Sequence, residues 1–128
     1  MRLLLDTHAF LWWLDGSRKL SRRARAAIGS GKNECFVSVA SAWEIGIKVS
    51  LGTLRIEGVL GRFLPEQLAA NGFQALGIDL KHAAAVATLP FHHRDPFDRL
   101  LAAQALEENL RIVTADAVFA KYGVTRVW

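Results

Sequence analysis

The stretch RLLLDTHAFLWWL, residues 2–14, shows the pattern that the rest of the chain repeats. Its first part, RLLLD (2–6), is a short apolar run that predicts a β-strand, and THAFLWWL (7–14) predicts a helix directly after it. Further short runs rich in Leu, Val and Ile alternate with longer helical patterns along the chain. Because helices between strands are typical of parallel sheets with right-handed crossovers, the sequence predicts an α/β fold.

The other expected elements follow from the same alternation. Four further strands are predicted, the last of them weak: CFVSV (35–39), FQALGI (73–78), RIVT (111–114) and VTRVW (124–128). Five further helical regions are predicted: SRRARAAIG (21–29), SAWEIGIKVSLG (41–52), VLGRFLPEQLAANG (59–72), KHAAAVATL (81–89) and DPFDRLLAAQALEEN (95–109). Pro65 is expected to break or kink its helix. The sequence therefore predicts a central parallel sheet of about five strands flanked by helices.

Length and composition fit one packed domain, with 128 residues of which 52% are hydrophobic. The longest continuous apolar run, AFLWWL (9–14), is far shorter than the roughly 20 residues that span a bilayer. The start, MRLLLD, also lacks the apolar stretch of about 7 to 15 residues that a secretory signal needs. We therefore expect a cytoplasmic protein.

The net charge indicates which kind of partner the protein binds, and the cysteine content excludes two kinds of site. The formal net charge is +4 and the isoelectric point is near 9.7, which favours a polyanion such as nucleic acid over an anionic lipid surface. The single cysteine, Cys35, lies in an apolar run and excludes both an internal disulfide and a thiolate zinc site.

Four acidic residues are expected at one edge of the predicted sheet. Asp6 ends the first strand, and Asp116 follows the fourth strand in the sequence TAD. Glu44 lies one turn into the helix after the second strand, and Asp98 opens the helix before the fourth strand. Because strand C-termini and helix N-termini gather along one edge of a doubly wound sheet, where ligands bind, these carboxylates should meet there.

Helix capping is the alternative explanation for each acid alone. Asp6 and Asp116 suit caps at strand-to-helix junctions, Ser41 and Glu44 match the spacing of a capping box, and Asp98 falls at a capping-box position. Capping explains the four together poorly, because two carboxylates about 4 Å apart repel by about 4 kcal/mol at an effective dielectric near 20. Converging acids need a cation, and an oxygen-only cluster suits magnesium or manganese. Such a metal would orient and deprotonate a water for attack on a phosphodiester.

Four segments together resemble the PIN-domain endoribonucleases of the VapC toxin type: LLLDTHAFLWWL (3–14), SAWEIGIK (41–48), RDPFDRLLAAQA (94–105) and IVTAD (112–116). The resemblance covers nearly the whole chain and implies a single PIN-like nuclease domain over 1–128, a three-layer sandwich around the parallel sheet. It implies a Mg²⁺- or Mn²⁺-dependent endoribonuclease whose catalytic and metal-binding acids correspond to Asp6, Glu44, Asp98 and Asp116. It also implies a homodimer and a separate antitoxin chain that blocks the site. Asp95 is then the helix cap.

Two groups of basic residues are candidates for substrate binding. In SRKLSRRAR (17–25), Arg18, Arg22 and Arg25 can share a helix face and form a track for phosphates, although a solvated helix surface explains them equally well. Arg99 follows Asp98 and could steer a phosphate, but solvation at the surface is the simpler interpretation.

Hydroxyl, imidazole and indole groups complete the candidates. Thr7 and Thr114 lie beside site acids and could bind a carboxylate or a metal-bound water, with local turn bonding as the alternative. The histidines are scattered along the chain, which argues against a histidine metal site: His8, His82, His92 and His93. Trp43 is expected in the core, and one of Trp12 and Trp13 at an interface, because adjacent helical residues face different ways.

Three other functions compete with that of a nuclease. A signalling receiver module needs paired acids after the first strand and a phospho-accepting aspartate after the third, whereas DTH supplies one acid and Asp79 better suits a helix cap. A phosphatase of the haloacid dehalogenase type needs an aspartate where His8 stands. The third alternative is a protein that binds RNA without cleaving it. The presence of all four acids argues against this alternative but does not eliminate it.

Overall fold

The computed structural model describes all residues, 1–128, and confirms the α/β class. Its strands are β1 (Arg2–Leu5), β2 (Glu34–Ser38), β3 (Gln74–Leu76), β4 (Arg111–Val113) and β5 (Arg126–Val127). Its α-helices are α1 (Thr7–Asp15), α2 (Arg22–Gly29), α3 (Val39–Ser50), α4 (Leu60–Asn71), α5 (Leu80–Ala85) and α6 (Pro96–Glu107), and two 3₁₀ helices are η1 (Val86–Thr88) and η2 (Ala117–Tyr122). None of these helices combines the length and apolar character that a membrane crossing requires.

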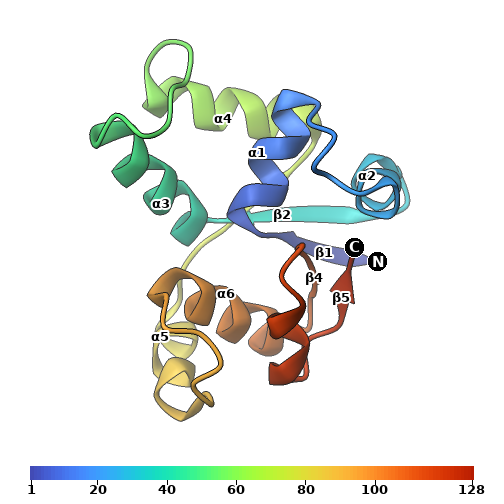
Figure 1. Cartoon of the computed structure of the whole chain (residues 1–128), viewed down its shortest axis with the longest axis vertical. Coiled ribbons are helices and arrows are strands. Elements are labelled where there is room, and N and C mark those ends of the chain that lie inside the picture. Colours follow the sequence, from blue (N-terminus) through green and yellow to red (C-terminus); the bar gives the residue numbers. More distant parts are fainter.

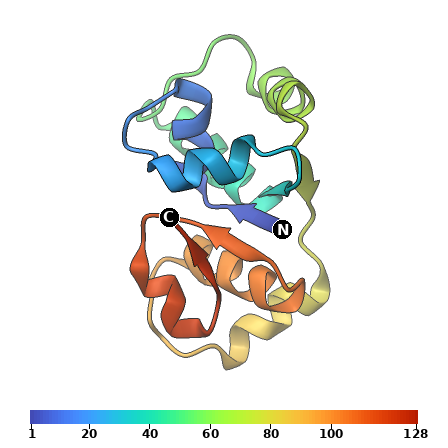
Figure 2. The same ribbon diagram turned by 90° about the vertical axis from the view of Figure 1, so that its right-hand side faces the viewer.

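All five strands form one parallel sheet in the order β3-β2-β1-β4-β5. The chain moves outward from β1 through β2 to β3, then returns to β4 on the other side of β1. Helices α1 to α4 cover one face of the sheet, and α5, α6 and η2 cover the other (Figures 1 and 2). Strand order therefore reverses between β1 and β4, and in sheets of this kind ligands bind beside the carboxyl ends of the strands at such a reversal.

Successive side chains of each strand point to opposite faces of the sheet, so the core has two layers. Leu3 and Leu5 of β1 pack on one face with Phe10 of α1, whereas Leu4 between them packs on the other face with Leu101 of α6. Each of these side chains is at most 1% exposed. A strand covered on both faces reads as a continuous apolar run, which is why RLLL was recognisable in the sequence.

Two details of the helices differ from the sequence predictions. The expected break at Pro65 does not occur, because α4 runs through it from Leu60 to Asn71. Leu60, Leu64 and Leu68 pack against the core on both sides of the proline, which compensates for the one backbone hydrogen bond that its ring removes. Helix α3 begins at Val39 rather than at residue 41, with Ser38 as its cap.

Candidate metal centre

Asp6 and Asp116 lie at the point where strand order reverses. Asp6 directly follows β1, and its backbone N–H donates to the Val113 carbonyl at the end of β4 over 3.1 Å. The Asp6 carboxylate caps α1 by accepting the Ala9 N–H at 2.7 Å. Burial raises the pKa of Asp6, although a hydrogen bond from the Thr114 hydroxyl opposes that rise. A carboxylate that is 9% exposed at a helix N-terminus is thus fixed in place but poorly solvated.

Glu44 lies in the second turn of α3 and is held by two neighbours. Its Oε1 is 2.7 Å from the Thr7 hydroxyl, and its Oε2 pairs with the Lys48 ammonium at 3.1 Å. The Thr7 hydroxyl is also 2.9 Å from Ser41 Oγ, and because it has one proton, it donates to the carboxylate and accepts from the serine. The predicted capping box of Ser41 and Glu44 is therefore wrong: Ser38 caps α3, and Ser41 is a buried residue inside it.

Asp98 lies in the first turn of α6, one turn after its cap. Asp95 accepts the Phe97 N–H at 2.8 Å and is the helix cap, as predicted. Burial, followed by repulsion from Asp95 and further from Glu44 and Asp6, raises the pKa of Asp98 to about 6. Acidic side chains from three parts of the chain therefore act on Asp98 at once.

Asp116 follows β4 and caps η2 through the Val118 N–H at 2.9 Å. Its Oδ2 lies 2.7 Å from Nε2 of His93, whose Nδ1 lies 2.9 Å from the Tyr122 hydroxyl. Burial alone would raise the pKa of Asp116, but the hydrogen bonds from His93 and Val118 outweigh it and lower the pKa. One potential ligand atom from each of His93, Asp98 and Asp116 lies within 4.8 Å of the others.

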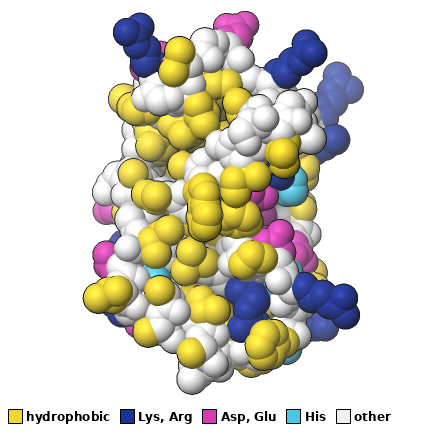
Figure 3. Space-filling model, turned by 90° about the vertical axis from the view of Figure 1, so that its left-hand side faces the viewer, with side chains coloured by type: hydrophobic (Ala, Val, Ile, Leu, Met, Phe, Trp, Pro, Cys, Tyr) yellow, Lys and Arg dark blue, Asp and Glu magenta, His cyan; other side chains and the backbone are white.

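The charge balance of this cluster fits a divalent cation. Lys48 neutralises part of Glu44, but no lysine or arginine forms an ion pair with Asp6 or Asp98. Acidic side chains gather between hydrophobic ones on the molecular face that carries α3 (Figure 3). Carboxylate oxygens that repel one another and lack a cationic partner are the donors that Mg²⁺ and Mn²⁺ take up.

The sequence matches the family described as PIN domain over residues 3–124. The chain belongs to the PIN domain family. It is similar to "Ribonuclease VapC22" from Mycobacterium tuberculosis (strain ATCC 25618 / H37Rv), with 32% identity over 115 residues that cover 89% of this chain and 86% of the relative. Proteins of this family use a divalent metal, and the acidic cluster of this chain agrees with that use.

Solved structures share the fold of this PIN domain. VapBC2 from Rickettsia felis, bound to a DNA fragment from its promoter, matches with a TM-score of 0.71 at 15% identity, covering 98% of this chain and 97% of that one. A toxin-antitoxin complex from Klebsiella pneumoniae matches with a TM-score of 0.59 at 17% identity, covering 89% and 86%.

Thr7 and Thr114 between them show both of the predicted roles, binding of a carboxylate and local turn bonding. Thr7 hydrogen bonds the Glu44 carboxylate across two helices, which is the carboxylate-binding alternative. Thr114, which is fully buried, accepts the Asp116 N–H at 3.0 Å as a local turn would, and its side chain also hydrogen bonds the Asp6 carboxylate. Each threonine therefore positions an acid of the cluster.

The basic candidates are not brought to the cluster. Helix α2, with Arg22 and Arg25, lies on the opposite side of the molecule from α3 (Figures 1 and 2), and Arg25 donates to the Ser17 carbonyl at 2.7 Å. The surface placement of Arg99 is wrong, because its side chain is buried and donates to three carbonyl groups, that of Val86 in η1 and those of Leu89 and Pro90 in the loop after it. The core placement of Trp43 is also wrong, because it is 62% exposed.

His93 lies beside the acidic cluster, which the sequence pattern does not predict. The four histidines are scattered along the chain, yet the loop before α6 returns to η2 and places His93 against Asp116. The signal available in the sequence was the position of His93 just ahead of RDPFD, the motif that contains Asp98.

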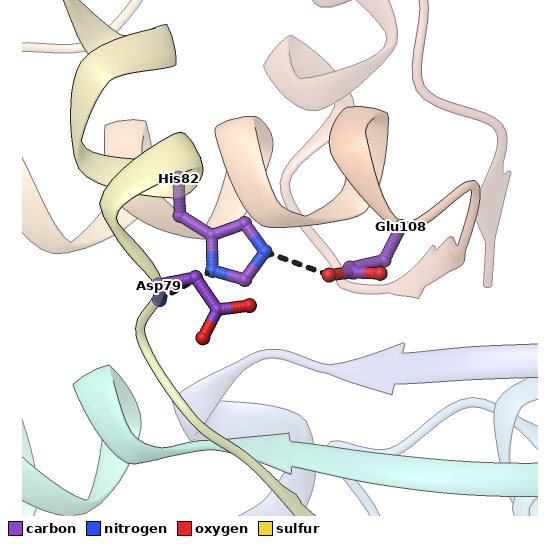
Figure 4. Close-up of side chains that lie close together, drawn as sticks. All are labelled: Asp79, His82 and Glu108. Atoms are coloured by element: carbon purple, nitrogen blue, oxygen red, sulfur yellow. Dashed lines mark hydrogen bonds and ion pairs between the residues drawn. The ribbon is translucent and has the colours of Figure 1, made fainter.

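A second group of potential ligands, Asp79, His82 and Glu108, is a closed hydrogen-bond network (Figure 4). The buried His82 accepts the Asp79 N–H at Nδ1 over 3.0 Å, and its Nε2 lies 2.9 Å from Glu108 Oε1. Lys81 pairs with the same Glu108 oxygen at 3.1 Å. Lys81 already balances the carboxylate that the imidazole contacts, so this network joins α5 to the end of α6 rather than offering a metal site.

Proposed function

We propose that this PIN domain is a metal-dependent endoribonuclease that hydrolyses RNA phosphodiester bonds as the toxin of a toxin-antitoxin pair. The observation that carries the proposal is Asp98, a half-buried carboxylate that other acids surround and that no basic side chain pairs with. The relative named a ribonuclease matches most of the chain and supports the same activity. A receiver module or a dehalogenase-type phosphatase is disfavoured by the family match over residues 3–124.

Mg²⁺, with Mn²⁺ as the alternative, is the ion that we assign to the four acids. Asp6, Asp98 and Asp116 would hold it, with Glu44 completing the oxygen donors. When bound, the ion supplies an activated water and neutralises the crowded phosphate oxygens. The protein's own part is orientation: Thr7 and Lys48 fix the Glu44 carboxylate before any ion arrives, so little reorganisation is needed on binding. The net charge of +4 favours approach of RNA.

Metal dependence is the first test of this function. We expect the purified chain to cleave labelled RNA with Mg²⁺ or Mn²⁺ and to lose that activity with a chelator, because no basic side chain pairs with Asp6 or Asp98. Gel analysis of a single-stranded RNA, with addition of excess metal after chelation, measures this. RNA bound but uncut with metal present would favour the non-cleaving RNA-binding alternative, and phosphorylation of the protein by a small phosphodonor would favour a receiver.

A groove beside the acidic cluster suits an antitoxin segment. Two cavities of about 290 and 300 Å³ share Leu11, Asp15 and Leu54 in their lining and lie between α1 and the loop after α3. His8 and Lys48 line one of them, and Lys48 is the ion-pair partner of Glu44. A groove that is lined by both apolar and charged side chains and that leads to a charged site fits an amphipathic segment with an end that reaches the site. We assign it to a separate antitoxin chain, in line with the toxin-antitoxin complex that shares the fold.

The outer face of α3 is the surface that we assign to a homodimer. Val39, Trp43 and Ile47 follow one another at four-residue spacing and are 44%, 62% and 36% exposed. Trp43 also contacts Phe97 at the start of α6, with ring centroids 5.3 Å apart, and the hydrophobic side chains form a band on this face (Figure 3). A helix stripe can pair with its own copy about a twofold axis, which buries the band on both chains.

We expect Trp43→Asp to convert the dimer to a monomer, because a charge at the centre of the buried stripe costs more than the contact provides. Light scattering after size exclusion measures the mass, and circular dichroism checks the fold. Val59→Asp is the matched control, since Val59 is 70% exposed but lies at the start of α4, outside the stripe. A dimer that survives in Trp43→Asp, or one that is lost in Val59→Asp, would contradict this assignment.

A further inference from the structure

We propose that His93 is a nitrogen ligand of the metal centre and that it gives the site a preference for Mn²⁺ over Mg²⁺. The proposal rests on the metal centre of the proposed function and adds a residue of a different donor type to its four acids. It starts from one juxtaposition: a ring nitrogen of His93 and one carboxylate oxygen each from Asp98 and Asp116 lie within 4.8 Å of one another, and Nε2 is the His93 atom that faces Asp116.

The spacing of these three atoms is close to that of ligands on one ion. Ligand atoms at about 2.1 Å from a cation are roughly 3–4 Å apart in octahedral geometry. The His93 Nε2 and Asp116 Oδ2 atoms form a hydrogen-bonded pair 2.7 Å apart, which an ion would separate by taking the place of the proton. One carboxylate oxygen of Asp98 lies within 4.8 Å of a potential ligand atom of each of these residues. Small side-chain adjustments would therefore place an ion between the imidazole and the two carboxylates.

The surroundings of the His93 ring fix its direction. The ring stacks on Tyr122 at 5.5 Å between centroids with an interplanar angle of 12°, and it packs against Phe119 at 4.7 Å. Its Nδ1 faces the Tyr122 hydroxyl at 2.9 Å. In the metal-free chain Nε2 donates to Asp116. Binding an ion requires the other tautomer, in which the Nε2 proton is lost and Nδ1 carries a proton that it donates to Tyr122, so that the lone pair of Nε2 points at the acids. This is the arrangement that metal-binding histidines adopt, with a hydrogen bond to the outer nitrogen.

His93 and His82 differ in whether a basic side chain already pairs with the carboxylates beside them. At His82 a lysine sits on the carboxylate that the imidazole contacts, whereas no basic side chain pairs with Asp98 beside His93. Asp98 thus still lacks a cationic partner, and Nε2 of the neighbouring His93 ring is directed at Asp116.

A nitrogen donor changes which ion the site prefers. Mg²⁺ prefers oxygen ligands and keeps several waters. Mn²⁺ is a first-row transition metal and, like the others of that row, also accepts nitrogen ligands such as imidazole. Three or four carboxylates alone would bind both ions through charge. Replacement of one oxygen or water by an imidazole nitrogen therefore favours Mn²⁺ selectively.

Binding of Mn²⁺ to the metal-free chain, without a polyhistidine tag, tests this directly. We expect the electron spin-echo modulation of bound Mn²⁺ to show coupling to a ¹⁴N nucleus in the parent chain and in His92→Ala, and to lose it in His93→Ala. We also expect His93→Ala to weaken Mn²⁺ affinity by about tenfold or more, while Mg²⁺ affinity, from competition, changes by less than about threefold. His92 is the matched control because it is the adjacent histidine, is exposed, and contacts Tyr122 only by its ring edge.

The alternative role for His93 is to position Asp116 without touching the ion. Absence of ¹⁴N coupling in the parent chain, or equal loss of Mn²⁺ and Mg²⁺ affinity in His93→Ala, would overturn the proposal in favour of that role. Should His93→Ala unfold, the same measurements on His93→Gln, which keeps the side-chain length, decide the question. Failure of the ribonuclease function is seen separately, as a chain that binds Mn²⁺ with nitrogen coupling but leaves RNA uncut.

Discussion

Asp98→Asn is expected to reduce metal-dependent RNA cleavage by on the order of 10³-fold and, at the same time, to stabilise the metal-free chain. Cleavage falls because the amide keeps the shape of the side chain but removes a negative charge that holds the ion. Cleavage rates of the variant and the parent at saturating Mg²⁺ measure the first effect. Asp95→Asn is the matched control, since asparagine also caps helices and Asp95 serves α6 as its cap.

The stabilising effect follows from the pKa of Asp98. The folded chain raises this pKa from an ordinary value of 3.8 to about 6, through burial and then through the neighbouring acids. The folded state therefore holds a proton that the unfolded state releases, and the stability of the metal-free chain falls as the pH rises from about 4 through 6. Because Asp98 is only half-buried, we expect asparagine to recover about 1 kcal/mol above pH 6.

Thermal unfolding with a chelator, at pH 4 and at pH 7.5, measures the stabilising effect. The variant should melt a few degrees above the parent at pH 7.5, and the difference should vanish at pH 4, where the parent's Asp98 is protonated as well. Excess Mg²⁺ should reverse the order, because the parent gains more from binding the ion. If Asp95→Asn abolishes cleavage and Asp98→Asn does not, the cap and the metal ligand have exchanged roles and this assignment is wrong.

The edge on which the four acids meet was predictable from the sequence because topology converts chain order into position. Once short apolar runs alternate with helical patterns, strand ends and helix starts must share an edge, and Asp6 and Asp116 follow strands that the structure pairs with each other. The cap at Asp95 was equally readable, since Pro96 and the two following residues carry the local signature of a helix start. These predictions rest on local chemistry and on a rule of handedness.

The environments of Trp43 and His93 depend on tertiary contacts, which the local sequence does not predict. Trp43 looks like a core residue in an apolar helix, but it lies on the exposed face of α3, where its ring contacts Phe97 at the start of α6. His93 reaches Asp116 because a loop without regular structure returns to η2. Loop courses of this kind are set by tertiary contacts, so the histidine could be found only in three dimensions.

Arg99 is the residue whose role changes most between sequence and structure, and its loss should have a large effect on stability. Its guanidinium donates to the carbonyls of Pro90 at 2.9 Å, Val86 at 3.1 Å and Leu89 at 3.4 Å, and it lies 4.2 Å from the ring of Phe91. We expect Arg99→Ala to lower the free energy of unfolding by about 3 kcal/mol, because carbonyl groups that the arginine satisfies lose their donor. Urea unfolding followed by circular dichroism measures this change.

Arg94→Ala and Arg99→Lys distinguish the hydrogen bonds of the Arg99 guanidinium from the effect of its positive charge alone. Arg94 is exposed, so its removal should change stability by less than about 0.5 kcal/mol. Lysine keeps the positive charge but cannot present the planar fork that reaches several carbonyls, so Arg99→Lys should be nearly as unstable as Arg99→Ala. Equal stability of Arg99→Lys and the parent would mean that charge, not geometry, matters. Because the clamped loop leads directly to His93, and His93 holds Asp116, loosening it should also weaken Mn²⁺ binding even where the variant remains folded.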